Sequence, residues 1–310
     1  MPSSIRATEE AYLASLSGKV AIITGAASGL GKRLAEVLGE HGLKLVLIDI
    51  DPSVSQLSAR LPNAAHLTLD LCAPNAFDAC LAHALATFGA VDIIVNNAGI
   101  ANSCSLFSQE DGQDLAHIID LNLKAPMDAT RVAVRYFRQS RRQGVVLNTA
   151  SVGGLMPISL MESYGTTKAA LIFFTATCKA LAPQVRVNAV APYFADTPLV
   201  ANNRLVRSYP LVQQIGLMSP DKVVRTMIRA LADTDLAGDT LMVAMGASPE
   251  KLSFYDDLTM QVTTYITKGT INKYAASFSS FFSKALNSVL GFLRTPLPVE
   301  DRSRDNNKTD

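Results

Sequence analysis

The sequence predicts an α/β fold in which a parallel, doubly wound sheet carries helices on both faces. Three observations lead to this prediction. Short apolar runs alternate with longer amphipathic stretches from Lys19 to about Gly246, the runs are nearly continuous in hydrophobicity, and a glycine-rich turn follows the first of them. Strands buried on both faces need unbroken apolar runs, and their alternation with helices is typical of parallel sheets.

The expected strands are the apolar runs at residues 19–24, 44–49, 66–71, 91–96, 145–149, 185–191 and 240–245. Apolar residues recur at helical spacing between them, which predicts helices at residues 32–41, 76–88, 111–138, 163–181 and 220–232. After Gly246 the alternation stops. We therefore expect an N-terminal arm at 1–15, one domain at 16–248, a helical appendage at 249–295 and a disordered tail at 296–310.

Charge and composition exclude several classes of protein. The 28 Lys and Arg residues balance the 27 Asp and Glu residues, so the basic surplus typical of nucleic-acid binding is missing. The four cysteines form no Cys-x-x-Cys pair and have no histidine at metal-binding spacing, which predicts neither a disulfide framework nor a metal site. The polar N-terminus and the lack of an apolar stretch of about 18 residues predict a cytoplasmic protein.

The glycine-rich turn predicts a nucleotide site. Thr24-Gly-Ala-Ala-Ser-Gly-Leu-Gly31 joins the first strand to a helix, and its glycines let the backbone and the helix N-terminus approach a pyrophosphate. Asp49 ends the second strand, where a carboxylate accepts hydrogen bonds from ribose hydroxyls and repels a 2′-phosphate. Ile50 and Asp51 follow in place of a basic residue. The sequence therefore favours NAD over NADP.

Further motifs occur in a fixed order along the same strands and helices. Asn96-Asn-Ala-Gly99 follows the fourth strand, Asn122 lies in the next helix, Ser151 follows the fifth strand, and Tyr164-Gly-Thr-Thr-Lys168 comes thirteen residues after that serine. Over about residues 16–247 the chain resembles the classical short-chain dehydrogenases/reductases, and loosely their 15-hydroxyprostaglandin dehydrogenase-like branch. The resemblance implies a Rossmann-type sheet and an NAD(P)-dependent oxidoreductase.

The spacing of Tyr164 and Lys168 suits an acid–base role for the tyrosine. Tyr164 and Lys168 are four residues apart and share one helix face. A nearby ammonium lowers the pKa of a phenol from its usual value of about 10, which makes Tyr164 a candidate general acid/base. The resemblance implies that Lys168 also holds the nicotinamide ribose, that Ser151 hydrogen-bonds the substrate oxygen, and that Asn122 holds a water connecting Lys168 to solvent.

The resemblance also implies the rest of the cofactor site. Asp70 and Leu71 match the position that meets the adenine, Asn97 the residue that lines the nucleotide site, and the segment 192–197 the turn that contacts the nicotinamide. Tyr193 stands where the family has glycine, so a positive φ there would strain the backbone. The expected cofactor-binding residues are Gly25, Ser28, Gly29, Leu30, Gly31, Asp49, Asp70, Leu71, Asn97, Tyr164, Lys168, Pro192, Ala195 and Thr197.

The substrate side is expected to be apolar. The segment 198–219, which sets specificity in the family, supplies apolar residues and few charges, and Met156 and Met161 add apolar surface near Tyr164. We expect a secondary alcohol or ketone on a lipid-, steroid- or terpenoid-like body. The alternatives are an NADPH-dependent carbonyl reductase and a non-catalytic NAD-binding regulator. The histidines at 41, 66, 83 and 117 are interpreted as surface or packing residues.

Two parts of the sequence predict that the protein associates with a second subunit or with another surface. The resemblance implies a homodimer or homotetramer through the helices at 111–138 and 163–181, and the apolar cluster at 171–174 exceeds the needs of one buried helix face. The segment 274–293 carries an apolar stripe at helical spacing. That stripe packs either on the protein's own body or partner subunit, or on a membrane or lipid-droplet surface as a peripheral contact.

Overall fold

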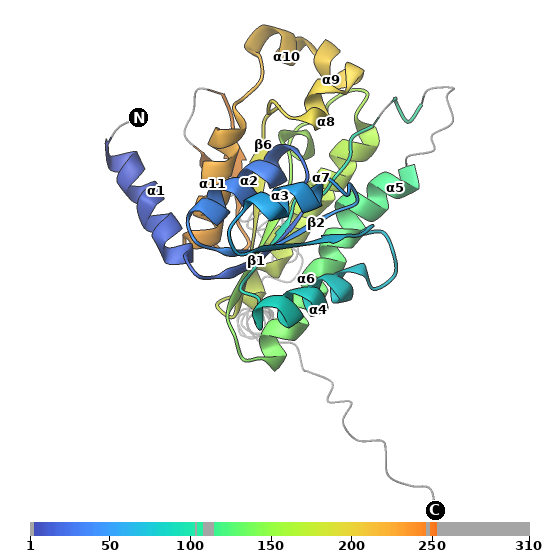
Figure 1. Ribbon diagram of the computed structural model, residues 1–310. Coiled ribbons are helices and arrows are strands. Elements are labelled where there is room, and N and C mark those ends of the chain that lie inside the picture. Colours follow the sequence, from blue (N-terminus) through green and yellow to red (C-terminus); the bar gives the residue numbers. More distant parts are fainter. Residues whose placement is uncertain (1–2, 103, 108–114, 246–248, 253–310) are drawn as a thin grey trace, which may run out of the picture. The chain divides into compact units, whose positions relative to one another are not determined.

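The computed structural model describes residues 3–102, 104–107, 115–245 and 249–252 (Figure 1). The chain divides into two units, residues 1–255 and 256–310, and the second lies outside the described residues. The apolar stripe predicted at 274–293 and the tail predicted at 296–310 lie outside them as well. Of the helical appendage predicted at 249–295, only residues 249–252 are described. Among the described helices, none is long and apolar enough to cross a membrane.

The core of the first unit is one sheet of eight strands in the order β3-β2-β1-β4-β5-β6-β7-β8. The first seven strands pair in parallel, which confirms the predicted doubly wound sheet, and β8 pairs antiparallel to β7. The strands are β1 (Val20–Thr24), β2 (Lys44–Asp49), β3 (Ala64–Thr68), β4 (Ile93–Asn96), β5 (Gly144–Thr149), β6 (Val185–Pro192), β7 (Thr240–Val243) and β8 (Glu250–Leu252).

Several strand ends differ from the sequence prediction by one or two residues, and two strands, β3 and β8, differ by more. β3 ends at Thr68 rather than at 71, because its partner β2 ends at Asp49, which pairs with Thr68. The strand β8 was not predicted, and it adds residues to the sheet beyond the boundary expected at 248. Its three residues are too few and too polar to give a strand pattern. Lys251 of β8 instead forms an ion pair of 2.8 Å with the buried Asp239, which precedes β7.

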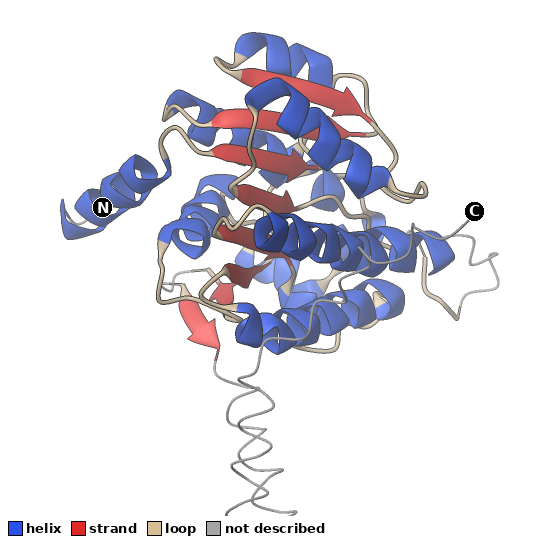
Figure 2. Cartoon of the chain, turned by 90° about the horizontal axis from the view of Figure 1, so that it is seen from below, coloured by secondary structure: helices blue, strands red, loops and turns tan. Residues whose placement is uncertain are grey.

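Helices cover both faces of the sheet (Figure 2). One hydrophobic cluster joins one face to α1 (Ser3–Leu16), α2 (Gly29–Glu40), α3 (Val54–Arg60) and α11 (Pro220–Ala232). Two clusters join the other face to α4 (Ala76–Phe88), α6 (Ala125–Gln139) and α7 (Glu162–Thr177). The predicted bounds of α4 and α11 are confirmed, whereas α1 and α3 were not predicted as helices. Four short helices complete the described part: α5 (Leu115–Ile119), α8 (Pro198–Ala201), α9 (Arg204–Ser208) and α10 (Pro210–Ile215).

The helix predicted at 111–138 is interrupted. The described part consists of α5, a π-helical turn η1 (Asp120–Lys124) and α6. Pro126 lies at the start of α6 and has no backbone N–H to donate to the preceding turn, which gives a physical reason for the wider turn. The interruption places Asn122 inside the protein, with 1% of its surface exposed.

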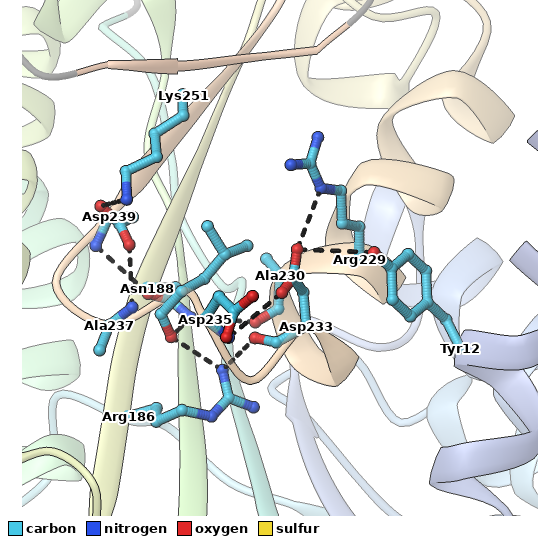
Figure 3. A network of polar contacts seen from close by, with 11 residues as sticks. Tyr12, Arg186, Asn188, Arg229, Ala230, Asp233, Asp235, Ala237, Asp239 and Lys251 are labelled. Atoms are coloured by element: carbon cyan, nitrogen blue, oxygen red, sulfur yellow. Dashed lines mark hydrogen bonds and ion pairs between the residues drawn. The ribbon is translucent and has the colours of Figure 1, made fainter. Parts of the chain in front are cut away.

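A polar network anchors the end of α11 to the sheet (Figure 3). The guanidinium of Arg186, on β6, donates hydrogen bonds to the carbonyl oxygens of Leu231 (2.5 Å), Asp233 (2.9 Å) and Leu236 (3.0 Å). The last carbonyls of a helix have no partner within the helix, so Arg186 satisfies groups that burial would otherwise penalise. Tyr12 of α1 donates to the carboxylate of Asp233 at 3.5 Å, which connects the first helix to the same network.

We expect Arg186→Met to lower the free energy of unfolding by about 2–3 kcal/mol, because the substitution keeps most of the volume but leaves three carbonyl groups without their charged donor. Urea titration followed by circular dichroism measures this loss. Arg60→Met, at the exposed end of α3, is the matched control and is expected to change stability by less than about 0.5 kcal/mol. Equal effects of the two substitutions would contradict the capping role of Arg186.

Candidate active site

A cavity of about 350 Å³ lies where successive strands of the sheet end. Its lining includes Gly25 after β1, Asp49 at the end of β2, Asn97 after β4, Ser151 after β5 and Tyr193 after β6. Ligands of doubly wound sheets bind outside the carboxyl ends of the strands, at the point where the strand order reverses. Here that reversal falls between β1 and β4.

The glycine-rich turn leaves no room for a side chain at Gly25 or at Gly31. Gly25 has a φ of +65°, and a Cβ on Gly31 would lie 2.2 Å from the carbonyl oxygen of Gly25 and 2.5 Å from Nδ2 of Asn97. Gly31 therefore lies behind the turn and does not line the cavity, whereas Gly25, Ser28, Gly29 and Leu30 do. Ser28 precedes α2 without a side-chain capping bond among the described residues, so the first amides of α2 remain available to an anion.

The adenosine side of the predicted site is also assembled. The carboxylate of Asp49 accepts the N–H of Ala27 at 2.8 Å and the N–H of Asp51 at 2.9 Å, and this ties the carboxylate to the glycine-rich turn. Asp70 and Leu71 line the same cavity. These residues come from the loops after β2 and β3, which the parallel pairing of the two strands brings to one edge of the sheet.

Ser151, Tyr164 and Lys168 line one cavity, and the last two share a buried face of α7, as their spacing predicts. The ammonium of Lys168 donates to the carbonyl oxygen of Thr149 at 2.8 Å and lies 5.7 Å from the centre of the Tyr164 ring. The hydroxyl oxygen of Ser151 accepts the N–H of Gly153 at 3.1 Å. Three side chains with acid, base and hydrogen-bonding chemistry thus meet at one place.

Burial dominates the electrostatics of these groups. It raises the pKa of Tyr164, and a side-chain hydrogen bond with Ser151 lowers it in part. Burial also lowers the pKa of Lys168 to about 8. Lys168 was expected to bring the pKa of Tyr164 below its ordinary value, and this is not met in the structure. Burial destabilises the phenolate by more than the hydrogen bond with Ser151 stabilises it.

Asn122 does not line the cavity. Its Oδ1 accepts the N–H of Ile100 at 2.9 Å, and its Nδ2 donates to the carbonyl oxygen of Ile100 at 2.8 Å and to the hydroxyl of Thr167 at 3.3 Å. A Cβ on Gly99 would lie 3.0 Å from Oδ1 of Asn122 and 3.4 Å from Nζ of Lys168. Gly99 thus lies between the two side chains, and the water expected between Asn122 and Lys168 remains a prediction.

The turn after β6 is built without strain. Tyr193 has a negative φ, and its N–H donates to the carbonyl oxygen of Val243 at 2.8 Å, which continues the pairing of β6 with β7. The strain considered for tyrosine at this position does not arise, since the turn needs no left-handed residue here. Pro192, Ala195 and Thr197 line the cavity beside it, and their contact with the nicotinamide stays a prediction.

Apolar side chains form the other end of the cavity. Ile158, Met161, Phe194, Val200 and Val206 line it, the last two from α8 and α9 within the segment 198–219. Met156, predicted to add apolar surface near Tyr164, is 43% exposed and does not line the cavity.

Two polar residues of the lining, Thr149 and His117, were not among the predicted site residues. His117 was interpreted as a surface or packing residue, and its side chain is indeed exposed. It also lines the cavity, and its Nδ1 lies 3.8 Å from the sulfur of Cys72. A signal was present, because His117 and Leu121 are four residues apart and both line the cavity from α5 and η1. The apolar lining residues Ile100, Ala101 and Ile158 carry no comparable signal.

These features fit a nicotinamide dinucleotide. The free amides of α2 suit its pyrophosphate, and the Asp49 carboxylate suits ribose hydroxyls. The ammonium of Lys168 has three N–H groups, and among the described residues one acceptor is found for them, so donors remain for a second ribose. The residues present therefore suit the pyrophosphate and the two riboses of such a cofactor.

Known proteins share these features. A family model described as short chain dehydrogenase matches residues 19–207. The short chain dehydrogenase helC of Aspergillus fumigatus is 32% identical over 71% of this chain and 93% of its own length, and the 3-oxoacyl-[acyl-carrier-protein] reductase FabG of Vibrio cholerae is 32% identical over 74% and 98%. The crystal structure of a 3-ketoacyl-(acyl-carrier-protein) reductase from Brucella melitensis, complexed with NADH, has a TM-score of 0.69 and 29% identity, covering 74% of this chain and 98% of that one.

These matches do not separate the 15-hydroxyprostaglandin dehydrogenase-like branch from others. They agree with the strand order, the glycine-rich turn and the motifs on α7. The chain belongs to the short-chain dehydrogenase family and is an NAD(P)-dependent oxidoreductase.

Proposed function

We propose that the protein oxidises a secondary alcohol to a ketone on a hydrophobic substrate, with NAD as cofactor and Tyr164 as the general base. One observation carries the proposal: Ser151, Tyr164 and Lys168 line a cavity whose substrate end consists of apolar side chains. In the reverse direction the phenol of Tyr164 is the general acid that protonates the oxygen of the ketone.

Each side chain has a distinct task in this reaction. Tyr164 takes the proton of the substrate hydroxyl, and Ser151 donates a hydrogen bond to the substrate oxygen. Lys168 holds the cofactor ribose, and Asn122 holds a water that links Lys168 to solvent. The nicotinamide supplies the acceptor for the hydride when it is bound. The geometry of Lys168 supports its role, since Nζ lies within reach of both the cavity and the Tyr164 ring.

Asp49 supports NAD over NADP. Its carboxylate is fixed by two backbone amides at the rim of the cavity, beside the exposed Ile50, so a 2′-phosphate would meet a held negative charge. The Brucella melitensis relative is complexed with NADH, which agrees with this choice.

The walls of the cavity support an apolar substrate. A sugar or an amino acid needs many polar partners, whereas the side chains around the substrate end, such as Ile158, Phe194 and Val206, offer none. The relative from Vibrio cholerae is named as a 3-oxoacyl reductase, which agrees with a carbonyl group on an apolar chain.

A homodimer or homotetramer is part of the proposal. Ile119 of α5, Met127 of α6 and Phe173 of α7 are large apolar side chains with 42%, 41% and 56% of their surface exposed. Leu171 and Ile172 of the predicted cluster are buried inside the subunit, so Phe173 is the residue of that cluster best placed for a partner subunit.

We expect Tyr164→Phe to lower kcat at least 100-fold, because proton transfer groups contribute about 10²–10⁴-fold to rates. The assay follows NAD reduction at 340 nm over a panel of hydrophobic secondary alcohols, with sugar alcohols for comparison. NAD binding, measured by calorimetry, is expected to stay within a few-fold. Tyr136→Phe on α6 is the matched control. Retention of more than about a tenth of the wild-type kcat in Tyr164→Phe would remove the general-base role.

Ser151→Ala is expected to move the pH dependence of alcohol oxidation to higher pH. The hydrogen bond with Ser151 lowers the pKa of Tyr164, so its loss raises that pKa further and leaves less phenolate at any pH below the inflection. The measurement is kcat/KM against pH for the best alcohol of the panel, with Ser140→Ala at the end of α6 as control. An unchanged inflection would show that Ser151 does not act on Tyr164.

Asp49→Ala is expected to raise affinity for NADP roughly tenfold or more, because it removes a negative charge that faces the 2′-phosphate. Fluorescence titration with NADH and NADPH measures both affinities. Asp51→Ala removes a neighbouring exposed carboxylate and is expected to leave the ratio of the two affinities unchanged. A ratio that moves equally in both variants would mean that net charge, rather than Asp49 itself, sets the preference.

A further inference from the structure

The segment after β4 contains a buried amide that the proposed reaction does not use. Asn102 is 4% exposed and forms hydrogen bonds with two distant parts of the chain. Its side chain contacts the first turn of α7, which carries Tyr164, and its backbone carbonyl contacts Asn203, the residue that precedes α9. These bonds connect the substrate end of the cavity to the phenol-bearing helix.

The first contact caps α7 from another segment. Met161 precedes the helix and has no side chain that could cap it, and the N–H of Gly165 is the first to bond within the helix, to the carbonyl oxygen of Met161. The N–H of Tyr164 comes before that point and has no helical carbonyl to meet. Oδ1 of Asn102 accepts it at 2.9 Å, and Nδ2 of Asn102 donates to the hydroxyl of Ser163 at 3.4 Å.

The second contact reaches the lid, defined here as residues 198–219. Nδ2 of Asn203 donates to the carbonyl oxygen of Asn102 at 2.7 Å, while Oδ1 of Asn203 accepts the N–H groups of Leu205 and Val206 at 3.0 and 3.2 Å. Asn203 is thus the capping residue of α9 and at the same time its link to Asn102. Val206, in the first turn of α9, lines the substrate end of the cavity.

The segment that contains Asn102 is attached to α7 at a second point. The hydroxyl of Ser105 donates to the carboxylate of Glu162 at 3.0 Å, and the N–H of Leu106 donates to the same carboxylate at 3.3 Å. Glu162 is the first residue of α7. The side chain of Asn102 thus bonds to the first turn of α7, and the side chain of Glu162 in that turn bonds to the segment. Because of these bonds, we expect a displacement of Asn102 to move the backbone of Tyr164.

We propose that Asn102 is a positioning residue for Tyr164 and that Asn203 makes this position depend on the lid helix α9. A substrate body that rests on Val206 thereby holds the cap of α7 in place, which couples recognition of the apolar body to the rate of proton transfer. The catalytic part of this inference rests on the proposed role of Tyr164. An amide suits the position because it supplies an acceptor and a donor without burying a charge.

The test uses the full chain and two pairs of substitutions. Asn203→Asp keeps the oxygen that caps α9 but loses the donor to Asn102, whereas Asn203→Ala loses both. Asn102→Ala removes the cap of Tyr164, whereas Asn102→Asp keeps an oxygen that accepts its N–H. Each conservative variant therefore separates one bond from the others.

Amide hydrogen exchange, read by NMR or by mass spectrometry of fragments, needs no substrate. We expect the Tyr164 amide to exchange at least tenfold faster in Asn102→Ala and close to the wild-type rate in Asn102→Asp. In Asn203→Asp the Tyr164 amide is expected to exchange faster while the amides of Leu205 and Val206 keep their protection. An unchanged Tyr164 amide in Asn203→Asp would overturn the link to the lid.

Turnover tests the same link on the reaction. Asn203→Asp is expected to lower kcat several-fold in the wild-type chain and to have no further effect in Asn102→Ala, with NADH affinity unchanged in all variants. Equal effects in both backgrounds would show that Asn203 does not act through Asn102. Tyr164→Phe, assayed in parallel, separates the two proposals: if it retains turnover, the general-base role fails, while hydrogen exchange still decides whether Asn102 and Asn203 position α7.

Discussion

The carboxyl ends of β1 and β4 are held together by Thr24 and Asn97, and the cavity depends on this junction. The hydroxyl of Thr24 accepts the N–H of Asn97 at 3.0 Å and donates to the carbonyl oxygen of Val95 at 3.1 Å. The side chain of Asn97 in turn donates to the carbonyl oxygens of Thr24 and Gly25 at 3.1 and 3.2 Å. The strand order reverses here, so the junction fixes the glycine-rich turn against the loop that leads toward the substrate end.

Burial, more than charge pairing, sets the electrostatics of the site. Tyr164 and Lys168 lie on the same buried face of α7, and loss of water moves their pKa values in opposite directions, upward for the phenol and downward for the ammonium. Burial therefore shifts the balance of both groups toward their neutral forms, compared with the same groups in water. A hydrogen bond with Ser151 acts against this for the phenol, which makes the loop after β5 part of the acid–base system.

Short polar links position the elements around this face. Asn122 bonds both backbone groups of Ile100, and Asn102, two residues further on, caps α7 and accepts the bond from Asn203. The segment after β4 is thus tied to η1, to α7 and to the lid by asparagine side chains. Amides of this kind can satisfy a donor and an acceptor at once, which suits a loop that runs through the interior between helices.

The sequence by itself determined the alternation of strands and helices, the parallel sheet and the candidate residues Gly25 and Asp49. These follow from local patterns, because apolar runs, helical spacing and turn chemistry act over a few neighbouring residues. The family resemblance added the catalytic candidates Ser151, Tyr164, Lys168 and Asn122, together with Asn97 and the turn at 192–197, whose roles no local pattern could supply.

Only the tertiary structure decided which of these residues meet. It placed Gly31 and Asn122 behind the cavity, brought His117 into its lining, raised the pKa of Tyr164 and added β8 to the sheet. It also joined Asn102 to Tyr164, which lies 62 positions further along the chain, and to Asn203, which lies 101 positions further. Burial and such distant contacts depend on how whole elements pack, and a sequence pattern limited to neighbouring residues carries no information about them.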